Sequence, residues 1–300
     1  MNQTTLAYEQ LMERIVAWAQ TRPDIRAVIV LGSRARVDRP ADEWSDLDIV
    51  LIVTDSKAYL TSVDWLRNIS DFWITFLEPT ATGGEMERRV LFDDGLDVDF
   101  AIIPYAKVEQ MVQHGFPPEV AEVFHRGMRV LLDRDGLATR LNLPHAKPIS
   151  PRPPTQSEFL GAINDFWYHA VWTAKKLRRG ELWTAKACCD GYMKRLLLMA
   201  VELQAKLRNG LGCDTWYDGR FLERWADPRV LDRLRSAFAH YDEDDIGRAL
   251  VATMDLFRWL AQEAAERLDY PYPTLADERA TELVDTLLSG KTRAEAHDSA

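Results

Sequence analysis

The sequence predicts an α+β protein, with a mixed sheet and flanking helices in its N-terminal half and a helical bundle in its C-terminal half. Short apolar runs separated by turn residues fill the first half, and three- and four-residue apolar spacing fills the second. A proline-rich segment separates the two halves. The 300 residues suit two domains of ordinary size.

Apolar runs bounded by Gly, Pro and Asp predict strands in the first half. We expect six strands, in the segments AVIVLGS (27–33), LDIVLIV (47–53), FWITFL (72–77), RRVLF (88–92), VDFAIIP (98–104) and MRVLLD (128–133). Helical spacing at 5–20 and 105–113 predicts helices beside them. Together they predict helices packed on a sheet over residues 1–143.

The best candidate for a linker is residues 144–155, PHAKPISPRPPT, which hold five prolines in twelve positions. Helices do not propagate through such a run, because proline lacks the N–H donor and restricts the residue before it. Beyond it, strand patterns nearly vanish and residues 156–300 predict a helical domain. Helical spacing is found at 157–179, 183–208, 229–240, 244–268 and 274–288.

Composition excludes several classes of protein. Lys and Arg total 37 against 47 Asp and Glu, a net charge of −10, and no basic run is long enough to follow a phosphate backbone. We therefore expect no nucleic-acid partner. The three cysteines suit neither a disulfide framework nor a zinc site. No signal peptide or long apolar span is present, so we expect a cytoplasmic protein without a membrane partner.

The most informative segment runs from residue 27 to 53, where one apolar strand ends in Gly32-Ser33 and the next opens with Asp46-Leu47-Asp48. Side chains at i and i+2 of a strand share a face, so Asp46 and Asp48 lie close together. Two adjacent carboxylates repel each other unless a cation lies between them. Hard oxygen ligands of this kind suit Mg²⁺.

Gly32 permits a tight turn with exposed amides and Ser33 adds a hydroxyl, which together form a small anion cradle. Asp97 and Asp99 repeat the i, i+2 pattern at the start of a later apolar strand. Asp99 is the better third carboxylate, because an apolar run follows it directly. It could bridge metal ions or serve as a general base toward a hydroxyl.

The glycine–serine turn, the Asp-x-Asp strand and the later strand aspartate resemble the nucleotidyltransferase superfamily of the DNA polymerase β type. Closer resemblance is to the aminoglycoside 6-adenylyltransferases, the streptomycin-modifying resistance enzymes, and it covers nearly the whole chain. The blocks that carry it include GSRARVDRPADEWSDLDIVLIVTD, LFDDGLDVDFAIIP, RVLLDRDG, PTQSEFLGAINDFWYHAVWTAKKLRRGELWTAK, GRFLERW and AERLDYPYP. The helical half is included, where unrelated nucleotidyltransferases diverge.

The resemblance implies a nucleotidyltransferase domain at 1–143 and a substrate-binding helical domain at 156–300. It implies that Asp46, Asp48 and Asp99 hold Mg²⁺, with two ions expected, and act in catalysis. ATP would be the co-substrate, and its phosphates would meet four residues, Gly32, Ser33, Arg34 and Lys175.

For the acceptor, the resemblance implies binding by Asp165, Asp97 and Trp167. Asp165 belongs to the sequence Asn164-Asp165-Phe166-Trp167, where the family has Asn-Glu-Phe-Trp. Its carboxylate would face a cationic aminocyclitol, and an acidic protein would draw such a molecule in.

The implied activity is transfer of AMP from Mg-ATP to a hydroxyl of streptomycin, with release of pyrophosphate and resistance to the antibiotic. The partners would be ATP and streptomycin or a related aminoglycoside. We expect a monomer. Two alternatives remain open, namely transfer to another small-molecule or protein hydroxyl and a nucleotide-binding module without catalysis.

Overall fold

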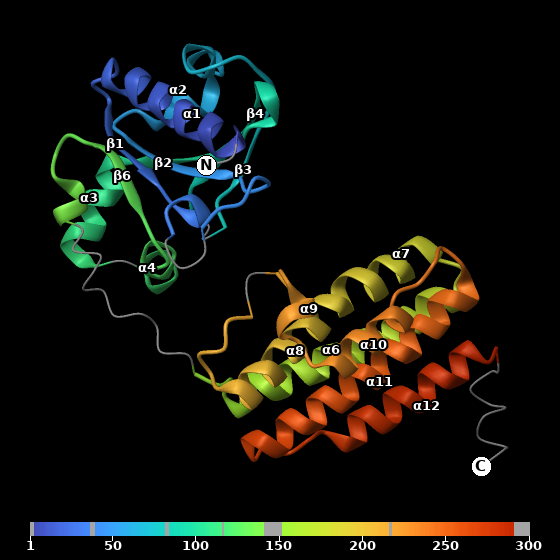
Figure 1. Cartoon of the computed structure of the whole chain (residues 1–300). Helices are drawn as coiled ribbons and strands as arrows, with labels where there is room; N and C mark the ends of the chain where they lie inside the picture. The colour runs from blue at the N-terminus through green and yellow to red at the C-terminus, as the bar shows by residue number, and fades with distance from the viewer. Residues whose placement is uncertain are drawn as a thin grey trace. The chain divides into compact units, whose positions relative to one another are not determined.

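The computed structural model describes residues 3–36, 40–81, 84–115, 117–140, 152–215 and 218–290. The chain divides into two compact units, Met1–Ser150 and Pro151–Ala300, and each is described by itself (Figure 1). Most of the proline-rich segment expected to be a linker, residues 144–151, lies outside the described residues.

The first unit is built on a six-stranded sheet in the order β3-β4-β5-β2-β1-β6 (Figure 1). Neighbouring strands are antiparallel except β2 and β5, which run parallel. The strands are β1 (Ile25–Val30), β2 (Leu47–Val53), β3 (Phe72–Pro79), β4 (Met86–Phe92), β5 (Asp97–Pro104) and β6 (Arg129–Asp133).

Helices cover both faces of this sheet, because successive side chains of the central strands point to opposite sides. On β2, Ile49 and Leu51 belong to a core beneath α1 (Gln3–Gln20) and α2 (Ser56–Thr61), whereas Val50 and Ile52 belong to a core on the other side. That second core contains side chains of α3 (Tyr105–His114), α4 (Pro118–His125) and α5 (Leu137–Arg140). The central strands are therefore mostly apolar and packed on both faces, apart from the aspartates at the start of β2 and β5.

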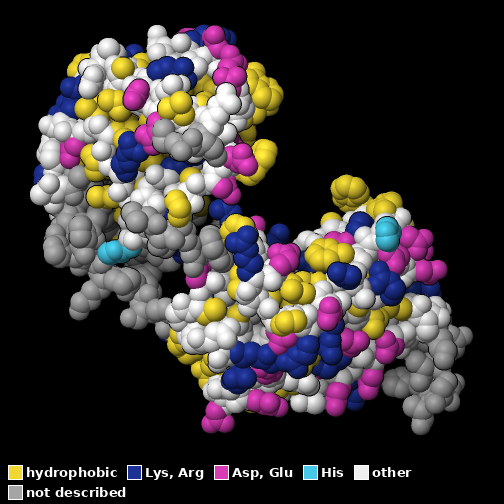
Figure 2. Space-filling view, viewed as in Figure 1, with side chains coloured by type: hydrophobic (Ala, Val, Ile, Leu, Met, Phe, Trp, Pro, Cys, Tyr) yellow, Lys and Arg dark blue, Asp and Glu magenta, His cyan; other side chains and the backbone are white. Residues whose placement is uncertain are grey.

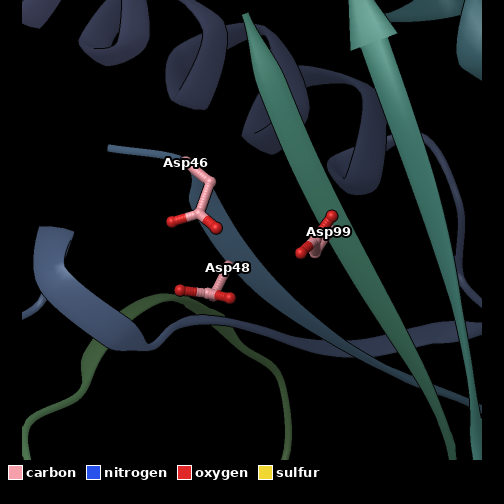
Figure 3. A group of neighbouring side chains, drawn as sticks. All are labelled: Asp46, Asp48 and Asp99. Atoms are coloured by element: carbon pink, nitrogen blue, oxygen red, sulfur yellow. The ribbon is translucent and has the colours of Figure 1, made fainter. Parts of the chain in front are cut away.

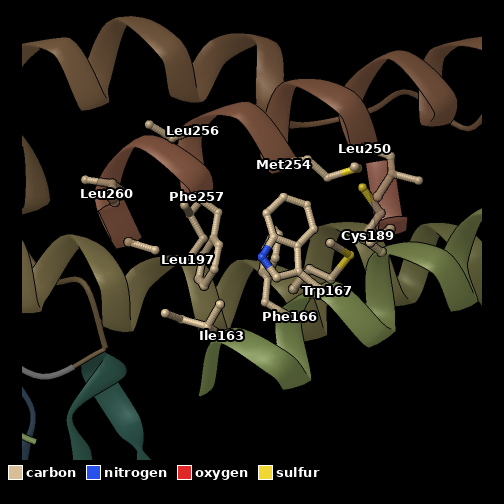
Figure 4. Packing of buried hydrophobic residues seen from close by; sticks show 14 of the residues in the cluster. Ile163, Phe166, Trp167, Cys189, Leu197, Leu250, Met254, Leu256, Phe257 and Leu260 are labelled. Atoms are coloured by element: carbon tan, nitrogen blue, oxygen red, sulfur yellow. The ribbon is translucent and has the colours of Figure 1, made fainter. Parts of the chain in front are cut away.

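The second unit is helical. Its helices are α6 (Gln156–Arg178), α7 (Leu182–Ala187), α8 (Met193–Asn209), α9 (Leu222–Trp225), α10 (Pro228–Ala237), α11 (Glu243–Leu268) and α12 (Thr274–Leu288). Figure 4 shows the core between α6 and α11, where the rings of Phe166 and Phe257 stack with centroids 3.6 Å apart. Trp167 meets Phe257 edge-on in the same core.

These elements confirm the α+β class and all six expected strands. One expected helix, 183–208, differs, because a π-helical turn at Cys188–Tyr192 separates α7 from α8. The helices α2, α4, α5 and α9 were not expected, since segments of four to eight residues are too short to show helical periodicity.

Charged side chains of both signs are interspersed on the visible face of each unit, so the net charge of −10 is not concentrated in one acidic patch there (Figure 2). Within the described residues, no helix combines the length and apolar character needed to cross a membrane.

Candidate metal and nucleotide site

Three carboxylates meet at one end of the parallel strand pair. One oxygen from each of Asp46, Asp48 and Asp99 lies within 4.8 Å of the others, and the three side chains converge on one space (Figure 3). The parallel register of β2 and β5 places Asp48 directly beside Asp99, and Asp46 lies two residues before Asp48. Since both relations keep side chains on one face, the sheet itself assembles the cluster.

Asp99 is the most buried of the three carboxylates, with 6% of its surface exposed. Burial raises the pKa of Asp99 to about 7; Arg89 opposes this rise, and Asp48 and Asp97 add to it. Arg89 Nη1 lies 3.0 Å from Asp99 Oδ2. The other oxygen, Oδ1, is buried and has no hydrogen-bond partner among the described residues. A buried oxygen of this kind costs free energy unless a cation or donor reaches it.

The turn after β1 lies directly against this cluster. Gly32 has a φ of +63°, and a Cβ atom there would collide with the Asp48 carboxylate, so only glycine permits this close approach. Next to it, the Ser33 hydroxyl is buried and has no partner among the described residues. The turn therefore carries a buried hydroxyl one residue after the glycine that lies against Asp48.

Arg34 supports the backbone next to the aspartate cluster. Its guanidinium donates to the backbone carbonyls of Asp46, at 2.9 Å, and Ser45, and lies 3.4 Å from the centre of the Tyr8 ring. Burial lowers the pKa of Arg34. In this arrangement Arg34 holds the chain that carries Asp46.

Asp97 stands close to the cluster but outside it. Its backbone N–H donates to the Tyr8 hydroxyl at 3.0 Å. Burial raises the pKa of Asp97, and the charge of Asp46 raises it further. Asp97 therefore adds negative charge to the region without joining the three converging oxygens.

The remaining expected residues lie in the helical unit, on α6. The carboxylate of Asp165 accepts from the Tyr192 hydroxyl at 2.8 Å and lies 2.7 Å from His169 Nδ1. Asp165 is partly exposed. Its carboxylate, the His169 imidazole and the Tyr192 phenol therefore form a cluster near the surface.

Trp167 and Lys175 line one pocket of about 360 Å³ between α6 and α12. Trp167 is 2% exposed and belongs mainly to the helical core, whereas Lys175 is exposed. The other lining side chains are mostly apolar or aromatic, with a second cation from α12: Asn164, Tyr168, Val171, Trp172, Ala276, Arg279, Ala280 and Leu283.

Sequence reasoning missed two residues that shape the site, Arg89 and Tyr8. Arg89 lies opposite Asp99 in the β4–β5 register, and Tyr8 comes from α1. Neither stands near the aspartates in the sequence, so no local motif could have identified them.

Comparison with known proteins finds relatives along most of the chain. It is 23% identical over 282 residues to the aminoglycoside 6-adenylyltransferase of Campylobacter jejuni, covering 92% of this chain and 94% of that protein. It is 24% identical over 272 residues to the protein of the same name from Bacillus subtilis (strain 168), covering 88% and 92%.

A crystal structure of an aminoglycoside 6-adenyltransferase from Bacillus subtilis is 21% identical and covers 93% of this chain and 98% of that one, with a TM-score of 0.43. The sequence model of the family described as streptomycin adenylyltransferase matches residues 6–287. Since that match includes the converging aspartates and nearly all of both units, the chain belongs to this family of nucleotidyltransferase enzymes.

Proposed function

We propose that the protein transfers AMP from Mg-ATP to a hydroxyl of streptomycin and releases pyrophosphate. The observation that carries the proposal is the convergence of Asp46, Asp48 and Asp99 beside the buried hydroxyl of Ser33. Both relatives above are named for adenylyl transfer to aminoglycosides, which supports this acceptor class.

The three carboxylates fit divalent ions. They supply hard oxygen ligands, and the buried Oδ1 of Asp99 has no other partner among the described residues. Mg²⁺ bound there would neutralise charge on the α-phosphate and the leaving pyrophosphate. The residues that hold it are Asp46, Asp48 and Asp99.

The turn at Gly32 and Ser33 is assigned to the phosphates. Gly32 allows the chain to pass close to Asp48, and the Ser33 hydroxyl donates to a phosphate oxygen. Arg34 supports this turn by fixing the backbone at Ser45 and Asp46. The acceptor's hydroxyl oxygen then bonds to the α-phosphorus, the bond to pyrophosphate breaks, and the hydroxyl proton is lost to a base.

In the helical unit, Lys175 is assigned to the nucleotide. Its pocket contains a second cation, Arg279, and no carboxylate is among its lining residues, so it favours an anion. The aromatic side chains of Tyr168 and Trp172 line this pocket and suit a planar group. Trp167, which also lines it, is assigned to the acceptor.

Cationic groups of streptomycin are assigned to carboxylates. Asp165 is partly exposed and held in position by Tyr192 and His169. Asp97 contributes negative charge beside the aspartate cluster. These residues bind by charge rather than by shape, so we expect the KM for streptomycin to rise with salt.

The test is an assay of pyrophosphate release with Mg-ATP and streptomycin. We expect turnover by the wild type, loss of at least about a thousandfold in kcat for Asp48→Asn, and no change for Asp71→Asn, an exposed acid in the same unit. Mass spectrometry should find streptomycin heavier by one AMP group.

A panel of other aminoglycosides tests the acceptor. Turnover with a different aminoglycoside but not with streptomycin would show that the acceptor is wrong and that the proposed AMP transfer is right. No turnover with any member, or full activity of Asp48→Asn, would reject the proposal.

A further inference from the structure

One arginine on β4 binds three carboxylates from three strands. Each nitrogen of Arg89 has its own partner: Nε donates to Glu78 of β3, Nη2 donates to Glu87 of β4 at 3.2 Å, and Nη1 lies 3.0 Å from Asp99 of β5. The guanidinium is planar and rigid, so these three contacts fix its orientation. Glu78 and Glu87 thereby fix the orientation of the guanidinium group that contacts Asp99.

That contact engages only one oxygen of Asp99. Oδ2 faces Arg89, whereas Oδ1 is buried without a hydrogen-bond partner in the part of the chain that the structure describes. Since Asp99 also supplies an oxygen to the space shared with Asp46 and Asp48, tying down Oδ2 limits how the carboxylate can rotate.

We propose that Arg89 is a positioning residue, which fixes the Asp99 carboxylate so that one of its oxygens is presented to a divalent cation held with Asp46 and Asp48. This inference rests on the metal cluster in the proposed function but not on the identity of the acceptor. Hydrogen-bonded partners of metal ligands commonly change metal affinity or activity about 10–100-fold when they are removed.

The sign of the effect separates positioning from simple charge. If Arg89 were only a nearby positive charge, removing it would strengthen cation binding, because like charges repel. If it positions Asp99, removing it weakens binding. The two roles therefore predict opposite changes in the same measurement.

The experiment measures Mn²⁺ binding to the whole protein without substrates, by calorimetry and by the paramagnetic resonance of free Mn²⁺. For Arg89→Gln we expect affinity to fall about 10–100-fold. Arg89→Lys should lie between Arg89→Gln and the wild type, because one ammonium cannot meet three carboxylates separately. Asp99→Asn gives the reference for a lost ligand.

Arg88→Gln is the matched control. Arg88 is the neighbouring residue on β4, is 5% exposed, and bonds instead to the carbonyls of Tyr59 and Leu60. The Arg88→Gln variant should have a lower melting temperature than the wild type and the same Mn²⁺ affinity. Unchanged or tighter binding by folded Arg89→Gln, or equal weakening by Arg88→Gln, would overturn the inference.

Activity provides a second readout. Arg89 has its ion pair with Asp99 and only a longer-range charge interaction with Asp97, so Arg89→Gln should lower kcat by a larger factor than it changes the KM for streptomycin. If wild-type protein binds Mn²⁺ but transfers no AMP, the proposed function fails while the binding comparison still tests Arg89.

Discussion

The two units place their buried acids in different surroundings. In the sheet unit, Asp99 pairs with Arg89 through one oxygen but lies near the carboxylates of Asp48 and Asp97, and burial raises its pKa to about 7. In the helical unit, Asp277 is similarly buried but is gripped by Arg258, with donor distances of 2.8 to 3.0 Å. Tyr272 and Thr281 donate to the same carboxylate.

This difference is what we expect if Asp277 stabilises the fold and Asp99 serves the proposed metal site. A fully bonded carboxylate locks neighbouring helices together but has no oxygen left for a ligand. A crowded carboxylate costs stability, because ionised neighbours repel and burial removes water. Strain of this kind is commonly found at functional sites. Making the same substitution in each unit tests the contrast directly.

The largest effect on stability should follow Asp277→Asn. This change leaves the Arg258 guanidinium with a neutral amide, and breaking such a pair costs about 3 kcal/mol. We expect the free energy of unfolding of the helical unit to fall by that amount in urea denaturation followed at 222 nm. A loss below the measurement error would show that the pair is not stabilising.

The opposite sign is expected for Asp99→Asn. Removing the charge while keeping the size removes the cost of burying that charge and the repulsion from Asp48, which together outweigh the lost ion pair with Arg89, so metal-free protein should gain about 1 kcal/mol near pH 8. Thermal melting with and without Mn²⁺ provides the check, because the variant should also lose stabilisation by the ion. If Asp99→Asn destabilises the metal-free protein as Asp277→Asn does, the two acids do not differ as described.

The smallest effect concerns the start of α6. Arg152 and Thr155 lower the pKa of Glu158 to about 2, from an ordinary value of 4.5. Because the folded value is the lower one, this contribution is present above about pH 4.5 and is lost as pH falls toward 2. Glu158→Gln should therefore weaken the acid dependence of melting between pH 4.5 and 2.5. An identical profile for variant and wild type would contradict this assignment.

Much of the aspartate cluster was predictable, because it depends on residues that lie close together in the sequence. Short apolar runs bounded by turn residues predicted β2 and β5, and the i, i+2 spacing placed Asp46 and Asp48 on one face. The need for glycine at Gly32 also follows from its place between a strand and a charged loop. The functions assigned to these residues remain predictions.

Other features of the two units depend on contacts between residues far apart in the sequence, which no local pattern predicts. Nothing near Arg89 in the sequence indicates that β4 would place it opposite Asp99. Arg34 donates to two backbone carbonyls, because the folded loop brings those acceptors to it, and its contact with the phosphates stays a prediction. Trp167 lies mostly in the core because α11 packs against its helix, and its contact with the acceptor stays a prediction.

The amino-acid sequence by itself determined the α+β class, the strand positions, the longer helices and the family, since these depend on periodicity, turn chemistry and motif spacing. Tertiary structure alone decided which strands pair, that β2 and β5 run parallel, and thus that Asp99 meets Asp48 with Arg89 behind it. The physical reason is that the spacing of apolar side chains can be read from the sequence alone, whereas the pairing of strands depends on which arrangement buries the apolar side chains on both faces of the sheet.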